Sequence, residues 1–210
     1  MKNGSLPFIA ILTLSAFIIL TGFSRSEDIA QPSWIKPGAS IVYHGSLSIG
    51  GEGVLEATVR WSVKSMDADT ITLEACIESS NLRTSISRIF KVSAATGRLL
   101  SIDDEIIDTG RFFLWLYPPP DTGDIVEIEG LPYRVSGIES INASNRIWSC
   151  IVVNSTVDDP YIRGIATRWY DRETGIQVKV YMNLSFSYIF KGSNTTSSAE
   201  ADLILVSASI

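Results

Sequence analysis

The chain has 210 residues, of which 45% are hydrophobic and 19% charged, and its formal net charge is −6 at pH 7. Its lysines and arginines form no cluster or stripe, which argues against nucleic acid and anionic lipid surfaces as partners. One histidine and two cysteines are too few for a dedicated zinc site, and we expect no cofactor.

Residues 1–26 have the pattern of an export segment. Lys2 is followed by an apolar run from Leu6 to Phe23, and the polar residues 24–28 come next. The length of this run is near the lower limit for a membrane-spanning helix, so the segment is either a cleaved signal peptide or a retained N-terminal anchor helix. Phe23 stands where a lipidated cysteine would be, which argues against a lipid anchor. We expect residues 27–210 outside the cell or on its surface, tethered to the membrane if the segment is retained.

Residues 27–210 are expected to form a single antiparallel β domain. Apolar and polar side chains alternate over residues 55–63, 71–77 and 176–190, as in strands with one face in a core and the other in water. The last run would extend about 50 Å, so it must bend or pass between sheets. The other expected strands are 40–49, 86–94, 98–107, 125–129, 133–141, with a bulge at Gly137, 146–153, 165–170 and 203–209.

Turn residues separate the expected strands. Thr96-Gly97 and Thr174-Gly175 each stand at a hairpin tip, after an aromatic residue on the incoming strand, Phe90 or Tyr170. This is at most a weak internal echo, and we interpret it as two uses of the same turn. Residues 103–116 are the only helical candidate, and residues 192–199 are expected to be a polar loop. Because no good helix is available to cover the sheet, apolar strand faces must pack on each other. The sequence therefore predicts an all-β antiparallel meander that forms a closed barrel, an incomplete barrel or a sandwich.

An aromatic segment followed by three prolines is the most distinctive candidate for a binding surface. It runs from Phe112 to Tyr117, and the prolines 118–120 fix an extended stretch that cannot lie within a central strand. Two interpretations are open: the segment fills one end of the β structure as core, or it contacts an apolar ligand or a partner. The candidate contact residues are Phe112, Phe113, Trp115 and Tyr117.

No group of residues indicates catalysis. His44, the only histidine, has no activated nucleophile near it in the sequence, and we interpret it as a strand-end residue. The acidic residues around Asp67 and Asp103 do not match the spacing of a calcium loop. We predict no catalytic and no metal-binding residues, and a protein that is not an enzyme.

Export would permit two covalent modifications. Cys76 and Cys150 lie in expected strands, where they could form a disulfide or remain two separate buried thiols. The N-glycosylation pattern occurs more often than chance predicts in a chain of this composition. The four acceptor residues are Asn142, Asn154, Asn183 and Asn194.

Two hairpins carry a resemblance to known groups of proteins. The motif Trp169-Tyr170-Asp171-x-x-Thr174-Gly175-Ile176, with Thr96-Gly97-Arg98-Leu99-Leu100 before it, resembles hairpins of uncharacterised secreted proteins of archaea. More remotely, the chain resembles the lipoprotein-carrier group. That resemblance implies an incomplete antiparallel barrel able to hold lipid acyl chains, although the group covers its barrel with helices and this chain offers barely one.

These observations predict a secreted or membrane-tethered, non-enzymatic β domain of the cell surface, with a structural or interaction role. The alternative is a binding protein that holds an apolar ligand or lipid in the cavity of a barrel or half-barrel. The expected partners are accordingly envelope proteins or an apolar ligand, together with the membrane if the N-terminal segment is not cleaved.

Overall fold

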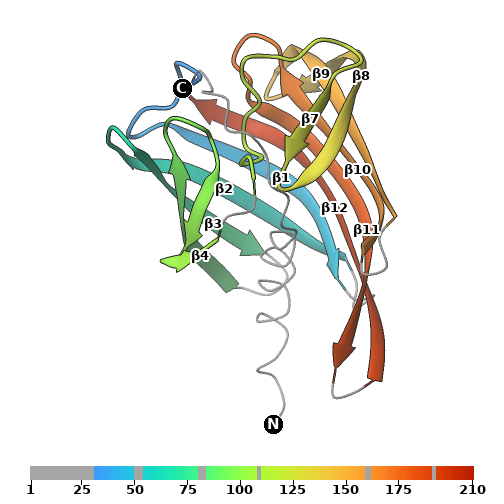
Figure 1. Ribbon diagram of the computed structural model, residues 1–210. Coiled ribbons are helices and arrows are strands. Elements are labelled where there is room, and N and C mark those ends of the chain that lie inside the picture. Colours follow the sequence, from blue (N-terminus) through green and yellow to red (C-terminus); the bar gives the residue numbers. More distant parts are fainter. Residues whose placement is uncertain (1–30, 50–53, 80–83, 108–109, 159–161, 191–192) are drawn as a thin grey trace.

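The computed structural model describes residues 31–49, 54–79, 84–107, 110–158, 162–190 and 193–210. All regular structure within these ranges is β, so the all-β prediction is confirmed (Figure 1). The expected signal or anchor helix lies outside the described residues. In the described part of the chain, no helix is long and apolar enough to cross a membrane.

The strands form one antiparallel meander. In chain order they are β1 (Ser40–Ile49), β2 (Val54–Met66), β3 (Thr70–Ser79), β4 (Thr84–Ser93), β5 (Leu99–Ile102), β6 (Glu105–Ile106), β7 (Ile125–Ile128), β8 (Leu131–Ala143), β9 (Arg146–Asp158), β10 (Ile162–Asp171), β11 (Gln177–Phe190) and β12 (Ser193–Ser209). Each pairs with the next in sequence except β6 with β7, and β1 pairs with β12. The order across the sheet is therefore β6-β5-β4-β3-β2-β1-β12-β11-β10-β9-β8-β7.

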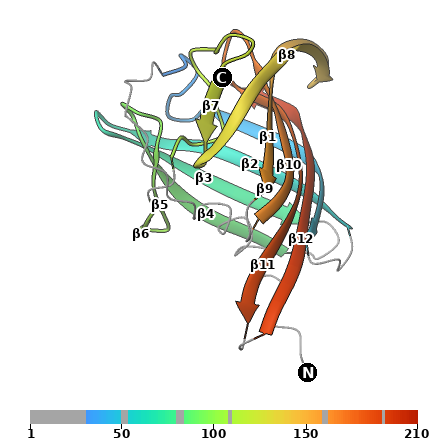
Figure 2. The same cartoon turned by 45° about the vertical axis from the view of Figure 1, so that its right-hand side comes forward.

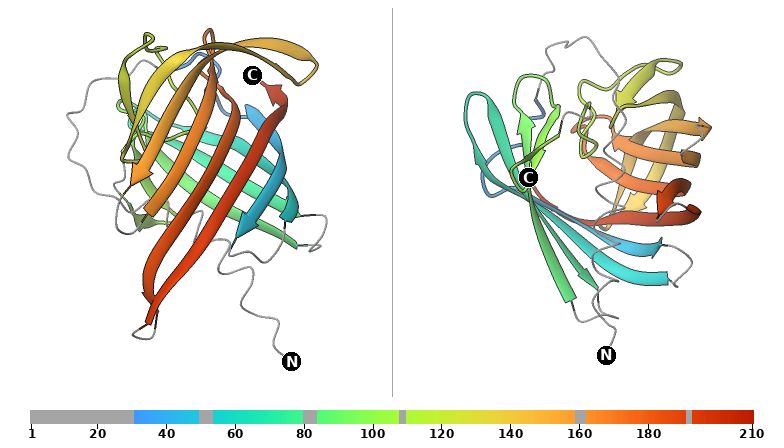
Figure 3. Two further views of the ribbon diagram at one scale, coloured as in Figure 1. Left: turned by 90° about the vertical axis from the view of Figure 1, so that its right-hand side faces the viewer. Right: turned by 60° about the horizontal axis from the view of Figure 1, so that its bottom comes forward.

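The sheet is not closed, because its two edges, β6 and β7, do not pair with each other (Figure 2). It curls so strongly that its two halves face each other across a concave side (Figure 3). Of the three arrangements that the sequence allowed, the structure has the incomplete barrel. Its open edges come from the middle of the chain, and its first and last strands lie side by side in the centre of the sheet.

Three local expectations were wrong. Residues 103–116 form no helix within their described part, since Glu105 and Ile106 are a strand and Arg111 and Trp115 make isolated bridges. The stretch 98–107 is not one strand, because Asp103 and Asp104 turn the chain between β5 and β6 with φ of 47° and 67°. Aspartate tolerates this left-handed conformation better than most residues. The expected loop over residues 192–199 is strand from Ser193 onward.

The end of the long alternating run over residues 176–190 projects beyond the sheet. The pairing of β10 with β11 reaches only to Phe186, and that of β1 with β12 only to Ala199. Beyond these points β11 and β12 pair with each other alone, which produces the extended hairpin at the bottom of Figure 1. The bulge expected at Gly137 is confirmed by a register shift between Val135 and Gly137 in the pairing of β8 with β9.

Candidate functional site

The aromatic segment crosses the concave side of the sheet and is bonded at both ends. We call residues 110–117 the strap. At one end the Phe112 N–H donates to the Gly97 carbonyl over 2.8 Å, beside β5. At the other end the Leu116 N–H donates to the Gly175 carbonyl over 2.9 Å, beside β11. The strap thus joins two hairpins that lie far apart in the order of strands.

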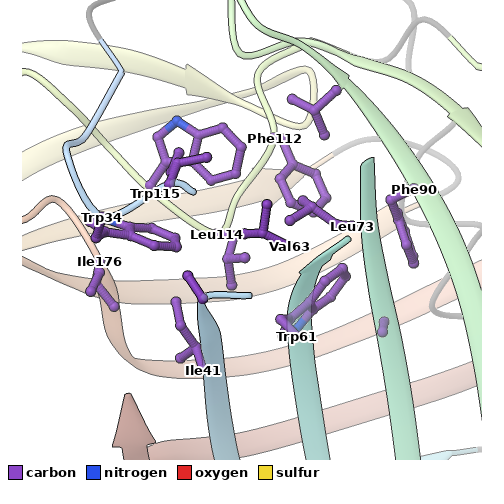
Figure 4. Close-up of a cluster of buried hydrophobic side chains, with 14 of the residues drawn as sticks. Trp34, Ile41, Trp61, Val63, Leu73, Phe90, Phe112, Leu114, Trp115 and Ile176 are labelled. Atoms are coloured by element: carbon purple, nitrogen blue, oxygen red, sulfur yellow. The ribbon is translucent and has the colours of Figure 1, made fainter. Parts of the chain in front are cut away.

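Aromatic rings fill the space between the strap and the sheet (Figure 4). The ring of Trp61 lies 4.8 Å from that of Phe90, 5.5 Å from that of Phe112 and 5.4 Å from that of Phe113, all edge-on. Trp115 continues the cluster, with centroid distances of 5.5 Å to Phe112 and 6.2 Å to Trp34. Edge-to-face pairs of this kind add about 0.5–1.5 kcal/mol each to the effect of burial.

The interior beneath the strap is filled at this point. A recess between the strap and strands β1 to β3 leaves no room for a water molecule; its lining residues are Trp34, Ala39, Ser40, Ile41, Trp61, Val63, Leu73 and Leu114. The described residues therefore show core packing in this recess, between the strap and strands β1 to β3.

The four predicted contact residues have two kinds of surroundings. Phe112 and Trp115 are buried in the aromatic cluster, whereas Phe113 and Tyr117 are half-buried. Pro118 and Pro119 are exposed. The most exposed part of this stretch is thus the pair of prolines that follows the strap.

A buried ion pair lies on the concave side of the other half, and the sequence did not reveal it. Arg168 of β10 is 2% exposed, and its Nη2 lies 2.5 Å from Oε2 of Glu129, in the turn between β7 and β8. The same guanidinium donates to the Tyr133 hydroxyl over 3.2 Å and to Oε1 of Gln177 over 3.3 Å. It also lies 5.2 Å from the centroid of the Phe113 ring.

The ion pair is connected to the strap by hydrogen bonds. The Glu129 N–H donates to the Arg111 carbonyl over 2.9 Å, and the Tyr170 hydroxyl donates to the Phe113 carbonyl over 2.8 Å. The Arg111 side chain donates to the Tyr117 carbonyl over 2.6 Å. Loss of the ion pair is therefore expected to loosen this end of the strap.

Burial sets the electrostatics of this group. Burial raises the pKa of the Glu129 carboxyl, against the opposing effect of the Arg168 charge. For Arg168, burial acts to lower the pKa, but the Tyr133 phenol and the Glu129 carboxylate outweigh it and raise the pKa. Arg168 therefore stays charged, and the nearby groups satisfy its donors.

The structure settles the phase of Arg168 in its strand, which the sequence left open because Ile165 and Trp169 are apolar residues on the other face. Ala166 and Tyr170 flank it at a spacing of two residues, and both are fully buried. Residues spaced by two share one face of a strand, so the Arg168 side chain had to point inward with them. Glu129 gave no such signal, because it follows the last residue of β7 and its contact with Arg168 depends on sheet order.

The structure does not bring Cys76 and Cys150 together. Both are free, Cys76 partly exposed on β3 and Cys150 buried on β9. Five strands separate β3 from β9 in the order across the sheet. Of the four acceptor asparagines, Asn142, Asn154 and Asn183 are exposed, and the side chain of Asn194 lies outside the description.

His44 has ordinary surface surroundings. Its Nδ1 lies 3.2 Å from the Thr58 hydroxyl, and its Nε2 lies 3.6 Å from a carboxylate oxygen of Glu56, with both side chains about half exposed. Within the ranges that the structure describes, no three His, Cys, Asp or Glu side chains are grouped to hold a metal ion.

Three solved structures show a remote likeness to the chain. A protein described as a lipoprotein, from Parabacteroides distasonis, aligns over 88% of this chain and 100% of its own, with 14% identity and a TM-score of 0.45. A hypothetical protein from Chlamydia trachomatis aligns over 80% and 88% of the two chains, with 11% identity and a TM-score of 0.36. A domain described as belonging to an outer membrane lipoprotein-sorting protein, from Vibrio parahaemolyticus, aligns over 85% and 86%, with 11% identity and a TM-score of 0.28.

No family model matches the chain, and no curated protein matches it either. One of the three structural descriptions names a lipoprotein and another a lipoprotein-sorting protein, and the more remote resemblance in the sequence was to the lipoprotein-carrier group. At these TM-scores the likeness carries no argument about function. The resemblance to archaeal secreted proteins remains an expectation.

Proposed function

We propose that the protein is an exported, non-enzymatic β domain of the cell surface with a structural or interaction role. The export pattern of residues 1–26 supports the location, outside the cell or tethered to its membrane. One observation carries the role: the strap occupies the concave side of the sheet, where a carrier of apolar ligands would need free space. The filled recess beneath the strap supports a core there, and on this proposal contacts with other molecules fall to the outer surface.

The energetics of the strap favour this role over ligand binding. A ligand that entered beneath the strap would have to displace Phe112, Leu114 and Trp115, each at most 2% exposed. Full burial of one large apolar side chain contributes about 1.5–3 kcal/mol. The ligand would also have to replace the backbone hydrogen bonds that hold the strap at both ends. An apolar molecule has no donors or acceptors for that purpose.

The exposed end of the strap is the proposed point of contact for a partner. Tyr117 and the prolines that follow it form a stiff, partly apolar stretch at the surface. Proline restricts the backbone before binding, so little conformational entropy is lost when a partner docks. The expected partners are proteins of the cell envelope.

Native mass spectrometry of the full chain after mild extraction tests the proposal against the alternative of an apolar ligand. We expect the mass of the protein with any attached sugars and with no lipid adduct. Reproducible lipid adducts that disappear in a Phe112→Ala, Trp115→Ala double variant would contradict the proposal. The matched control is Ile147→Ala, because Ile147 is 74% exposed and lies outside the strap.

A further inference from the structure

The two Thr-Gly turns have the same backbone structure. In the first, the Gly97 N–H donates to the Ser93 carbonyl over 2.9 Å, and in the second the Gly175 N–H donates to the Asp171 carbonyl over 2.9 Å. Gly97 and Gly175 have φ of 65° and 70°. In each turn the threonine N–H also donates to the side chain three residues before it: Thr96 to the Ser93 hydroxyl, and Thr174 to the Asp171 carboxylate.

The strands around the turns match as well. The difference in residue number between Gly97 and Gly175 also relates the bounds of these strands. Strand β4 spans Thr84–Ser93 and β10 spans Ile162–Asp171, so both bounds are related by this offset. The same offset carries Leu99, where β5 begins, onto Gln177, where β11 begins. The register shifts between Lys91 and Val92 in the first hairpin and between Trp169 and Tyr170 in the second.

The strap bonds to both turns in the same way. The Leu99 N–H donates to the Gly110 carbonyl over 3.1 Å, and the Gln177 N–H, at the matching position, donates to the Leu114 carbonyl over 3.1 Å. The Gly97 carbonyl accepts from the Phe112 N–H, and the Gly175 carbonyl accepts from the Leu116 N–H. Phe112 and Leu116 are four residues apart in the strap, as Gly110 and Leu114 are. Successive parts of one segment thus occupy equivalent places on two hairpins.

The order of the whole sheet has the same twofold character. Strands β1 to β6 form one meander and β7 to β12 a second, and the two meet where β1 pairs with β12. The strap lies between them in the chain. Over the two hairpins, residues 84–102 and 162–180, only the Thr-Gly pair is identical in sequence. For that reason the amino-acid sequence alone shows at most a weak echo of the repeat, and the backbone structure is needed to detect it.

We propose that β1–β6 and β7–β12 are two copies of one six-strand unit, held together by the strap, and that the second copy has an ionic contact where the first has an aromatic one. The offset that relates the two turns places Arg168 at the position of Phe90. Phe90 packs 5.9 Å from the ring of Phe112, and Arg168 lies 5.2 Å from that of Phe113. Each therefore contacts an aromatic ring of the strap, although the two rings are neighbours in the chain and not four residues apart like the backbone contacts.

This equivalence implies that the fold does not require the ion pair. The first copy satisfies the same position with an apolar ring and no charge. Replacement of a buried ion pair by apolar groups is often neutral or stabilising, whereas removal of one partner leaves an unpaired buried charge and is strongly destabilising. The Arg168 position should therefore accept phenylalanine, provided that Glu129 is removed at the same time.

The test compares melting temperatures of full-length Arg168→Phe, Glu129→Gly, and the double variant. Glycine suits position 129, where φ is 52°. We expect Arg168→Phe alone to melt roughly 6–20 °C lower than the parent chain, or not to fold. The double variant should recover to within about 4 °C of the parent. The matched control is Arg168→Val with Glu129→Gly, because valine is apolar like phenylalanine but has no ring to reach the strap.

The outcomes decide the proposal in both directions. Recovery in the phenylalanine double variant, and a lower melting temperature in the valine double variant, support the equivalence of Phe90 and Arg168. A phenylalanine double variant that melts no higher than Arg168→Phe alone, that fails to fold, or that equals the valine control overturns it. None of these results bears on whether the interior holds lipid, so the proposed function stands or falls separately.

Discussion

Cys76 and Cys150 differ sharply in environment although each lies on a strand. Cys150 is fully buried, and burial, aided by the charge of Asp171, raises its pKa to about 12. Burial and the neighbouring Glu78 and Glu74 also raise the pKa of Cys76, but part of that side chain is exposed. Because the thiolate is the reactive form, exposure and pKa together determine which cysteine reacts.

We expect one thiol to react in the folded protein and two after unfolding. At pH 8 a pKa of about 12 leaves about one Cys150 in 10,000 as thiolate, and its burial blocks access as well. Labelling by a maleimide or a disulfide reagent, counted by mass, measures this ratio. Cys76→Ser should abolish labelling of the folded chain, and Cys150→Ser should leave it unchanged. No labelling of the unfolded parent chain before chemical reduction, and labelling after it, would instead show that the two cysteines form a disulfide.

Arg168 shows how far the sequence reveals the candidate site at the scale of a residue. The sequence does not decide its phase, because Ala166 and Tyr170 on its own face are matched by Ile165 and Trp169 on the other. Nor does the sequence identify its partner, because Glu129 reaches it only through the pairing of β8 with β9 and of β9 with β10. Alternation states which face a side chain is on, and says nothing about which strand lies next to it.

At the scale of an element, the strap depends on close approach of its backbone to the second Thr-Gly turn. A Cβ atom at Gly175 would lie 2.7 Å from the Leu116 carbonyl oxygen. Gly123 also has a positive φ, of 100°, but a Cβ there would meet nothing within 4 Å. The two glycines thus separate the effect of backbone conformation from the effect of contact with the strap.

We expect Gly175→Ala to lower the free energy of unfolding more than Gly123→Ala does. Both variants place a side chain in a left-handed conformation, which costs about 1–2 kcal/mol. Gly175→Ala must in addition push the strap away and weaken its hydrogen bond from Leu116. Urea denaturation monitored by tryptophan fluorescence measures both, and Trp115 in the strap reports directly on the displacement. Equal losses in the two variants would mean that the strap does not rest on this turn.

The individual strands were largely predictable, and the strap was not. Alternation located β2, β3 and most of β11, because each has one buried and one exposed face. The helix expected over residues 103–116 failed because Asp103 and Asp104 close a hairpin and the backbone N–H groups of Phe112 and Leu116 donate to other hairpins. Those bonds join Phe112 to Gly97 and Leu116 to Gly175, over distances that no local pattern encodes.

At the scale of the whole molecule, the sequence restricted the architecture to three forms but could not choose among them. The choice depends on β1 pairing with β12, which leaves the edges of the sheet at β6 and β7 in the middle of the chain. Because these edges do not pair, the strap that connects them in the chain lies on the concave side of the sheet. The same arrangement leaves the convex side of the second half facing outward, with exposed Asn154 and Asn183 on β9 and β11.

The export hypothesis and these exposed asparagines lead to a prediction about the intact protein. When the full chain is expressed in a host that exports and glycosylates proteins, we expect loss of residues 1–26 and addition of sugar at Asn154. Thr156→Ala destroys the acceptor pattern of Asn154, whereas Thr156→Ser keeps it, and Thr156 is exposed on β9. Intact mass should therefore fall by one glycan in Thr156→Ala and stay glycosylated in Thr156→Ser. A full-length mass with no sugar in a protein that remains inside the cell would contradict the surface location.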